Sequence, residues 1–177
     1  MRIVAGRHKG RRLRTPAGAG TRPTADRVRE ALFSILGPVD GLHVLDLVAG
    51  SGALGLEALS RGAASATFVE SARPALAAIR ANLEATGDEG EVVASDVIAW
   101  LRAAAGHERT FDLVFCDPPY DAAAGIAQRL GELLPRVAAP EALIVTESSK
   151  RNPLALDLPL TDERTYGDTV IAIHRVG

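Results

Sequence analysis

Four consecutive residues, Asp117, Pro118, Pro119 and Tyr120, directly follow an apolar run and carry the sharpest chemical signal in the sequence. The two prolines fix φ and remove two backbone donors, so this turn presents carbonyl oxygens beside a carboxylate. Two such acceptors suit an exocyclic amino group of a base, because two hydrogen bonds favour a tetrahedral nitrogen whose lone pair is no longer delocalised into the ring. Tyr120 offers a face on which a base can stack, worth ~1–3 kcal/mol. The motif predicts a catalytic site that acts by positioning and electrostatics.

A glycine-rich segment upstream favours this catalytic interpretation over an ordinary strand-ending turn. Gly50, Gly52 and Gly55 match the dinucleotide pattern G-x-G-x-x-G, in which glycines let the backbone turn tightly against a ligand. Asp46, however, lies four residues before the first glycine, where a nicotinamide site normally has an apolar residue. A carboxylate suits a ligand with an ammonium group, such as the methionine moiety of S-adenosylmethionine, and suits a pyrophosphate poorly. The segment therefore predicts S-adenosylmethionine as the cofactor.

Two further acids at strand ends complete the predicted cofactor site. Glu70 can accept hydrogen bonds from both ribose hydroxyls, and Asp96 is placed to accept the adenine amino group. Asp96 is equally compatible with a helix cap, because the next helix is expected to begin at Val97. The predicted cofactor site consists of Asp46, Ala49, Gly50, Ser51, Gly52, Glu70, Ser71, Asp96 and Val97.

The elements that must position these residues alternate along the chain. Apolar runs predict strands over 42–47, 65–70, 91–94, 111–116 and 142–146, and helical patterns lie near 53–61, 73–85, 97–104 and 122–137. This alternation predicts an α/β fold with a Rossmann-like, doubly wound sheet of the class I methyltransferase type, with ligands at the carboxyl ends of the strands. Two last runs, 154–160 and 169–174, have no long helix between them and predict an antiparallel hairpin at the C-terminus.

Positive charge is gathered at the N-terminal end of the chain. The net charge is −2, but residues 1–30 contain nine Lys and Arg against two Asp and Glu. Such a basic segment favours a polyanionic partner over a solvated tail. We expect a basic, RNA-binding arm or hairpin over residues 1–24, separable from a methyltransferase domain over 25–177. The predicted RNA contacts are Arg7, Lys9, Arg11, Arg12, Arg14, Arg22, Arg27 and Arg29.

The remaining composition excludes several classes of protein. No apolar run approaches the ~18 residues that span a membrane, and the four histidines show no metal-ligand spacing, so neither a membrane nor a metal is expected. The single cysteine, Cys116, cannot form an internal disulfide and fits a reducing, cytoplasmic compartment. Because it lies inside an apolar strand, we interpret it as a buried cysteine and not as a nucleophile.

With these motifs placed, the sequence resembles the RsmD family along its whole length. The resemblance is carried by RIVAGRHKGRRL (2–13), RPTADRVREALF (22–33), DLVAGSGALGLEALSRG (46–62), DPPY (117–120) and RTYGDT (164–169). It implies S-adenosylmethionine-dependent methylation of a guanine N2 amine in 16S ribosomal RNA during maturation of the small subunit, by a monomeric enzyme. Val48 departs from the pattern, which has an aromatic residue there, and this alters the expected wall of the cofactor pocket.

Four alternatives differ in substrate or in class. DNA adenine-N6 and protein glutamine methyltransferases share an (Asn/Asp)-Pro-Pro-aromatic turn. The small size of the chain argues against sequence-specific DNA modification, and the basic arm argues against a protein substrate. An NAD-dependent oxidoreductase is disfavoured by Asp46, and a non-catalytic RNA-binding module leaves residues 117–120 unexplained. The leading prediction is an RNA (guanine-N2) methyltransferase.

Overall fold

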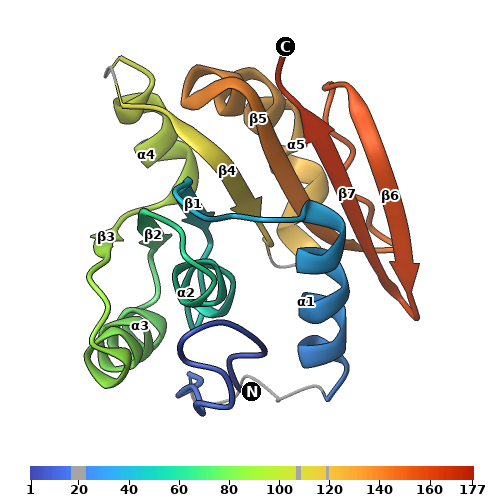
Figure 1. Ribbon diagram of the computed structural model, residues 1–177. Coiled ribbons are helices and arrows are strands. Elements are labelled where there is room, and N and C mark those ends of the chain that lie inside the picture. The colour runs from blue at the N-terminus through green and yellow to red at the C-terminus, as the bar shows by residue number, and fades with distance from the viewer. Residues whose placement is uncertain (17–22, 107–108, 119) are drawn as a thin grey trace.

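A seven-stranded mixed sheet forms the centre of the molecule, with the strand order β3-β2-β1-β4-β5-β7-β6 (Figure 1). The computed structural model describes residues 1–16, 23–106, 109–118 and 120–177, and their side chains except those of 23–25 and 120–125. The strands are β1 (His43–Leu47), β2 (Ser65–Glu70), β3 (Glu91–Ala94), β4 (Phe111–Cys116), β5 (Ala138–Ser149), β6 (Leu160–Tyr166) and β7 (Thr169–Arg175). The first five strands pair in parallel, and β7 pairs antiparallel with both β5 and β6.

Helices cover both faces of this sheet. They are α1 (Pro23–Leu36), α2 (Ala53–Ser60), α3 (Arg73–Thr86), α4 (Val97–Ala104) and α5 (Tyr120–Leu133), followed by the short 3₁₀ helix η1 (Leu134–Arg136). Successive residues of a strand point to opposite faces, so Leu113 and Phe115 of β4 pack with α1, α2 and α3, and Val114 packs with α4 and α5. The predicted α/β doubly wound fold with a C-terminal antiparallel hairpin is confirmed.

Most predicted strands and helices agree with the structure, and one strand does not. β2, β3 and β4 have the predicted bounds, whereas the predicted strand over 154–160 is wrong. Leu154 and Leu156 are buried in the core beneath α4 and α5, but they lie in a connecting loop, and the hairpin strand is Leu160–Tyr166. The leucines therefore mark a segment that packs on the core without joining the sheet.

The N-terminal arm, defined here as residues 1–14, folds back on α2 and α3 (Figure 1). Arg2 and Arg12 form an antiparallel bridge, and Ile3 and Leu13 are buried in the core. Glu57 of α2, which is fully buried, accepts hydrogen bonds from the backbone N–H groups of Val4 at 2.7 Å and Ala5 at 2.9 Å. These contacts attach the arm to the core, and removal of the arm would strip a buried carboxylate of two donors. The domain boundary at residue 24 stays a prediction.

Candidate active site

The glycine-rich loop connects β1 to α2 and borders one cavity of about 320 Å³. Its backbone has positive φ at Val48 (57°), Gly50 (57°) and Gly52 (76°), a region that glycine adopts without strain. Gly55 allows close packing of helix on strand, since a Cβ atom there would lie 2.4 Å from the Phe68 ring. The loop thus favours glycine at Gly50, Gly52 and Gly55, whereas Val48 adopts the same left-handed region with a β-branched side chain.

The first cavity collects the acids and apolar residues that were predicted to hold a nucleoside. Its lining includes Val48, Glu70, Ser71, Asp96 and Val97. These residues come from the carboxyl ends of β1, β2 and β3 or directly after them, where an open parallel sheet binds its ligands. Carboxylate acceptors beside aliphatic walls match the hydroxyl and amino donors and the flat ring of adenosine. The residues present therefore fit the predicted cofactor.

Glu70 has a second task besides lining this cavity. One carboxylate oxygen accepts the Gly50 N–H at 2.8 Å, and the other accepts the N–H groups of Ser71 and Ala72, both at 2.8 Å. The side chain therefore fixes the glycine-rich loop against the end of β2. A carboxylate has about four acceptor positions, so these three bonds leave capacity for a ribose hydroxyl.

Asp46 lies beneath the glycine-rich loop and is only 3% exposed. It accepts the Gly55 N–H at 2.9 Å. Burial raises the pKa of this carboxyl group to about 7; the hydrogen bond from Gly55 lowers the pKa, and the charge of Glu70 raises it further. Its position orders the start of α2, and a role in attracting a cofactor ammonium group stays a prediction.

Asp96 caps a helix and also lines the first cavity, the two roles that its sequence position allowed. Its Oδ1 accepts the Ala99 N–H at 3.0 Å, which caps the first turn of α4. The same residue lines the first cavity. Capping therefore holds the carboxylate at the place where an adenine amino group is expected.

A second cavity, of about 140 Å³, lies on the other side of the Asp117–Pro118 turn. Asp117 lines this second cavity, whereas Pro118, which is adjacent in sequence, lines the first. Pro119 is outside the described residues, and Tyr120 begins α5 but its side chain is not among those described, so the predicted stacking remains a prediction. The turn that carries the predicted catalytic carboxylate thus borders both cavities.

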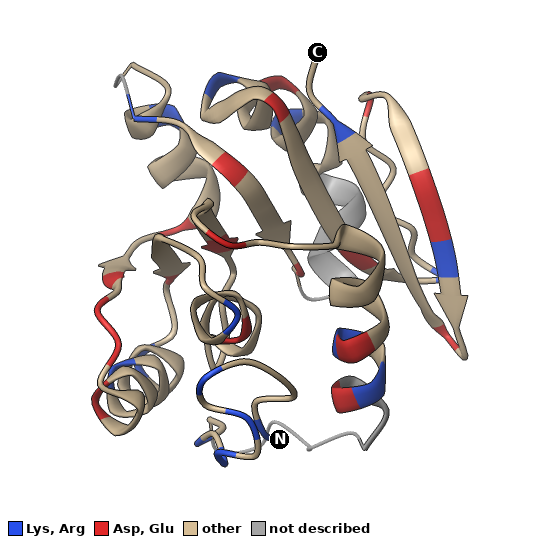
Figure 2. Cartoon of the chain, in the orientation of Figure 1, with Lys and Arg blue, Asp and Glu red and all other residues tan. Residues whose placement is uncertain are grey.

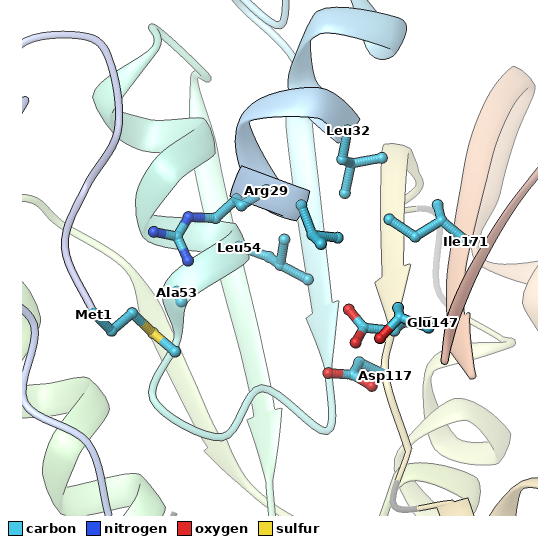
Figure 3. Close-up of a pocket in the computed structure, with 10 residues that line it drawn as sticks. Met1, Arg29, Leu32, Ala53, Leu54, Asp117, Glu147 and Ile171 are labelled. Atoms are coloured by element: carbon cyan, nitrogen blue, oxygen red, sulfur yellow. The ribbon is translucent and has the colours of Figure 1, made fainter. Parts of the chain in front are cut away.

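Glu147 of β5 faces the same second cavity and was missed by sequence reasoning. β4 and β5 are parallel neighbours in which Cys116 pairs with Thr146, so Asp117 and Glu147 follow at the same edge of the sheet. Figure 3 shows both carboxylates turned into the cavity. An acid directly after a predicted strand was the available signal, and it is the same signal that identified Glu70.

Cys116 is buried, and its pKa is raised, first by burial and then by the charges of Asp117 and Asp46. A thiol with a raised pKa is a poor nucleophile, because the thiolate is the reactive form. The geometry therefore supports its interpretation as a buried strand residue. Among the residues that the structure describes, no group of three metal-ligating side chains occurs, and no helix is long and apolar enough to cross a membrane.

Basic side chains gather on the N-terminal arm and the start of α1, at the bottom of Figure 2. Exposed members are Arg7, Lys9, Arg11, Arg12, Arg14 and Arg27. Arg7 also pairs with Asp88 at 2.6 Å, and Arg11 donates to the Ala85 carbonyl oxygen. Arg22 lies outside the described residues.

Arg29 does not belong to this exposed basic surface. It is 4% exposed and pairs with Glu57 at 3.4 Å and with Asp26 at 2.9 Å. It also donates to the Arg2 carbonyl oxygen. Its predicted RNA contact is corrected accordingly: the guanidinium group is buried, is engaged by these three acceptors and joins α1 to α2 and the arm.

The chain is similar to known proteins over nearly its whole length. Ribosomal RNA small subunit methyltransferase D of Escherichia coli is 42% identical over 87% of this chain and 77% of its own, and the Haemophilus influenzae protein of the same name is 36% identical over 94% and 89%. A solved structure of a hypothetical protein from Thermus thermophilus superposes with a TM-score of 0.84 at 35% identity, covering 99% of both chains. The family model described as conserved hypothetical protein 95 matches residues 1–175, so the chain belongs to this family, the RsmD family of the sequence analysis.

Proposed function

We propose that this protein methylates the exocyclic N2 amine of a guanine in 16S ribosomal RNA, with S-adenosylmethionine as methyl donor. One observation carries the proposal: the Asp117–Pro118 turn borders both a nucleoside-fitting cavity and a second, smaller cavity. A methyl group held in the first cavity would face an amine held in the second across this turn. The relatives named as small-subunit ribosomal RNA methyltransferases support the choice of RNA.

In this proposal the chain contributes positioning and acceptor groups. The bound cofactor supplies an electrophilic methyl group on a sulfonium. Asp117 accepts one hydrogen bond from the target amine, and the Pro118 carbonyl oxygen is expected to accept a second. These bonds would aim the nitrogen lone pair at the methyl group and stabilise the positive charge that develops on the nitrogen, which is electrostatic catalysis by preorganised groups. As the N–C bond forms the C–S bond would break, so that S-adenosylhomocysteine leaves as a neutral thioether and the methylated amine loses its extra proton to solvent. Glu70 and Asp96 hold the cofactor on the other side.

The exposed basic surface of the arm and α1 would hold the RNA backbone. Extruding a base from a helix or loop costs a few kcal/mol, and phosphate contacts supply binding energy that offsets this cost. We further propose that the enzyme acts as a monomer in the cytoplasm, on the RNA within the small subunit or its assembly intermediate. DNA adenine and protein glutamine methylation remain the alternatives that share the Asp-Pro-Pro-Tyr motif.

The test is incubation of the protein with labelled S-adenosylmethionine and either in vitro transcribed 16S ribosomal RNA or unmethylated small subunits. Mass analysis of the nucleosides should show N2-methylguanosine. Asp117→Ala should lower turnover by roughly 10²–10³-fold, the usual effect of losing one preorganised polar contact, while cofactor affinity measured by calorimetry hardly changes. Methylation of an adenine or of a protein would overturn the proposal. Loss of cofactor binding in step with activity would overturn the role given to Asp117.

A further inference from the structure

The walls of the second cavity are mostly apolar, with Arg29 and Thr169 also in the lining, and two acidic groups lie at one end. Leu32 of α1, Leu54 of α2 and Ile171 of β7 form walls, and the carboxylates of Asp117 and Glu147 lie together away from α1 (Figure 3). Such a slot suits a flat ring whose faces are apolar. Its acidic end suits an edge of that ring that presents hydrogen-bond donors and no acceptor.

The two carboxylates differ in how the backbone that carries each of them is held. Asp117 lies beyond the end of β4, in the turn that borders both cavities, so its carboxylate would lie near a methyl donor bound in the first cavity. Glu147 lies within β5, between the buried residues Thr146 and Ser148, and is only partly exposed. Glu147 pairs with Ile171 of β7 and lies one residue beyond Thr146, the last residue of β5 that pairs with β4, so the sheet holds its backbone from one edge and gives its side chain a defined direction. Glu147 is thus a rigidly mounted acceptor beside the proposed catalytic one.

The bases that carry an exocyclic amine differ in the group next to that amine. On its Watson–Crick edge guanine presents the N2 amine beside the N1–H donor, whereas adenine and cytosine each present an amine beside a ring nitrogen acceptor. A pair of carboxylates can bond both donors of guanine. Against adenine or cytosine, one carboxylate oxygen would face a lone pair with no proton between them, which is penalised where the bound base excludes water.

We infer that Glu147 is the residue that selects guanine, by accepting a hydrogen bond from N1–H while Asp117 accepts one from the N2 amine. The inference rests on the proposed function and deepens it, since it assigns the identity of the base to one side chain. Glu147 then acts in specificity and base orientation, and Asp117 acts on the reacting nitrogen. If Glu147 only supported β5, its substitution would lower activity on all substrates alike.

The experiment compares two RNAs that differ at a single base. Mass analysis of the wild-type product first locates the methylated guanosine, and splint ligation then replaces it with 2-aminopurine, which keeps the N2 amine but has an acceptor at N1. Initial rates give kcat/KM for both RNAs. The wild-type enzyme should prefer guanine by about 10- to 100-fold, the range for one hydrogen bond to a charged group.

Glu147→Gln should reduce this preference to within a few fold, because the glutamine amide can either accept from N1–H or donate to the N1 acceptor. Asp117→Ala should lower kcat/KM on both RNAs by similar factors, since both keep the N2 amine whose acceptor is removed. Glu141→Gln is the matched control, because Glu141 is an exposed acid on the same strand. It should leave both values at the wild-type level. Cofactor affinity and melting temperature check that each variant is folded.

Three outcomes separate the two proposals. Equal wild-type kcat/KM on the two RNAs overturns the role of Glu147 and needs no variant at all. An equal loss on both RNAs in folded Glu147→Gln also overturns it, and in both cases guanine-N2 methylation stands. A wild-type product methylated at an adenine or cytosine amine, or no RNA product at all, overturns the proposed function and the selection of guanine with it.

Discussion

Asn82 of α3 and Arg14 of the N-terminal arm exchange two hydrogen bonds through the Asn82 side chain. Its Oδ1 accepts the Arg14 N–H at 2.7 Å, and its Nδ2 donates to the Arg14 carbonyl oxygen at 3.0 Å. The same Nδ2 donates to the carbonyl oxygen of Ser51, also at 3.0 Å. Asn82 is buried, and one amide therefore connects the arm to the glycine-rich loop of the first cavity.

We expect Asn82→Ala to lower the free energy of unfolding by about 1–3 kcal/mol, because it removes the partner of the buried Ser51 carbonyl oxygen and of two partly buried backbone groups of Arg14. The affinity for S-adenosylmethionine should fall as well, since the loop loses a contact that holds Ser51. Urea unfolding and calorimetry measure the two effects. Asn152→Ala, at an exposed position, is the control. A variant with wild-type stability would show that the amide bridge contributes nothing.

The raised pKa of Asp46 predicts a pH-dependent stability. Its ordinary pKa is 3.8, and burial raises it to about 7 in the folded protein. Between these values the folded protein holds a proton that the unfolded chain has released, so its stability in the absence of cofactor should fall as pH rises from about 4 to about 7. Asp46→Asn should reduce this slope in urea unfolding series. Identical pH profiles for the two proteins would contradict the assignment to Asp46.

Glu70→Gln should weaken S-adenosylmethionine binding by about 1.5–3 kcal/mol, the range for hydrogen bonds to a charged group. A glutamine offers one carbonyl oxygen where the carboxylate accepts from Gly50, Ser71 and Ala72 through two. Its amide nitrogen would then oppose at least one N–H donor of the loop. Calorimetry measures the dissociation constant, with exposed Glu84→Gln on α3 as the comparison. A wild-type constant in Glu70→Gln would remove Glu70 from the cofactor site.

The exposed basic surface should act on RNA binding alone. We expect replacement of Lys9, Arg12 and Arg27 by glutamine to weaken binding of 16S ribosomal RNA and to reduce the slope of log affinity against log salt by about three, one unit per lost phosphate contact. Cofactor affinity should be unchanged. The control removes two exposed charges elsewhere, Arg102 on α4 and Arg136 of η1. Equal RNA affinity across a salt titration for the triple variant and the wild type would exclude this surface as the RNA contact.

The central sheet could be predicted because its strands are covered on both faces. Short, largely apolar runs at 65–70 and 111–116, alternating with helical patterns, are typical of the buried strands of an α/β protein, and the structure has strands with these bounds. β6 could not be predicted in this way, since its residues 160–166 are mostly exposed and polar. An edge strand held by backbone hydrogen bonds to one neighbour leaves no apolar pattern in the sequence.

The acids at strand ends were also predictable, whereas buried ion pairs were not. A parallel sheet places its carboxyl ends along one edge, so Glu70 and Asp96 could be assigned to one cavity, and Glu147 could have been added by extending that reasoning to the next strand. Glu57 and Arg29 show the limit of prediction from sequence. A count of charges treats every arginine as exposed, and only tertiary packing shows that this one is buried against a carboxylate.

During synthesis, the arm can complete its contacts only after its partner residues have been translated. Arg14 is separated by 68 residues from Asn82, its partner in the chain, and a ribosome that adds roughly 5–20 residues per second needs about 3–14 s to cross that interval. Until then Ile3 and Leu13 have no core in which to bury, and the basic side chains around them are carried on an unfolded segment. The segment translated first thus completes its contacts only after α3 has been synthesised.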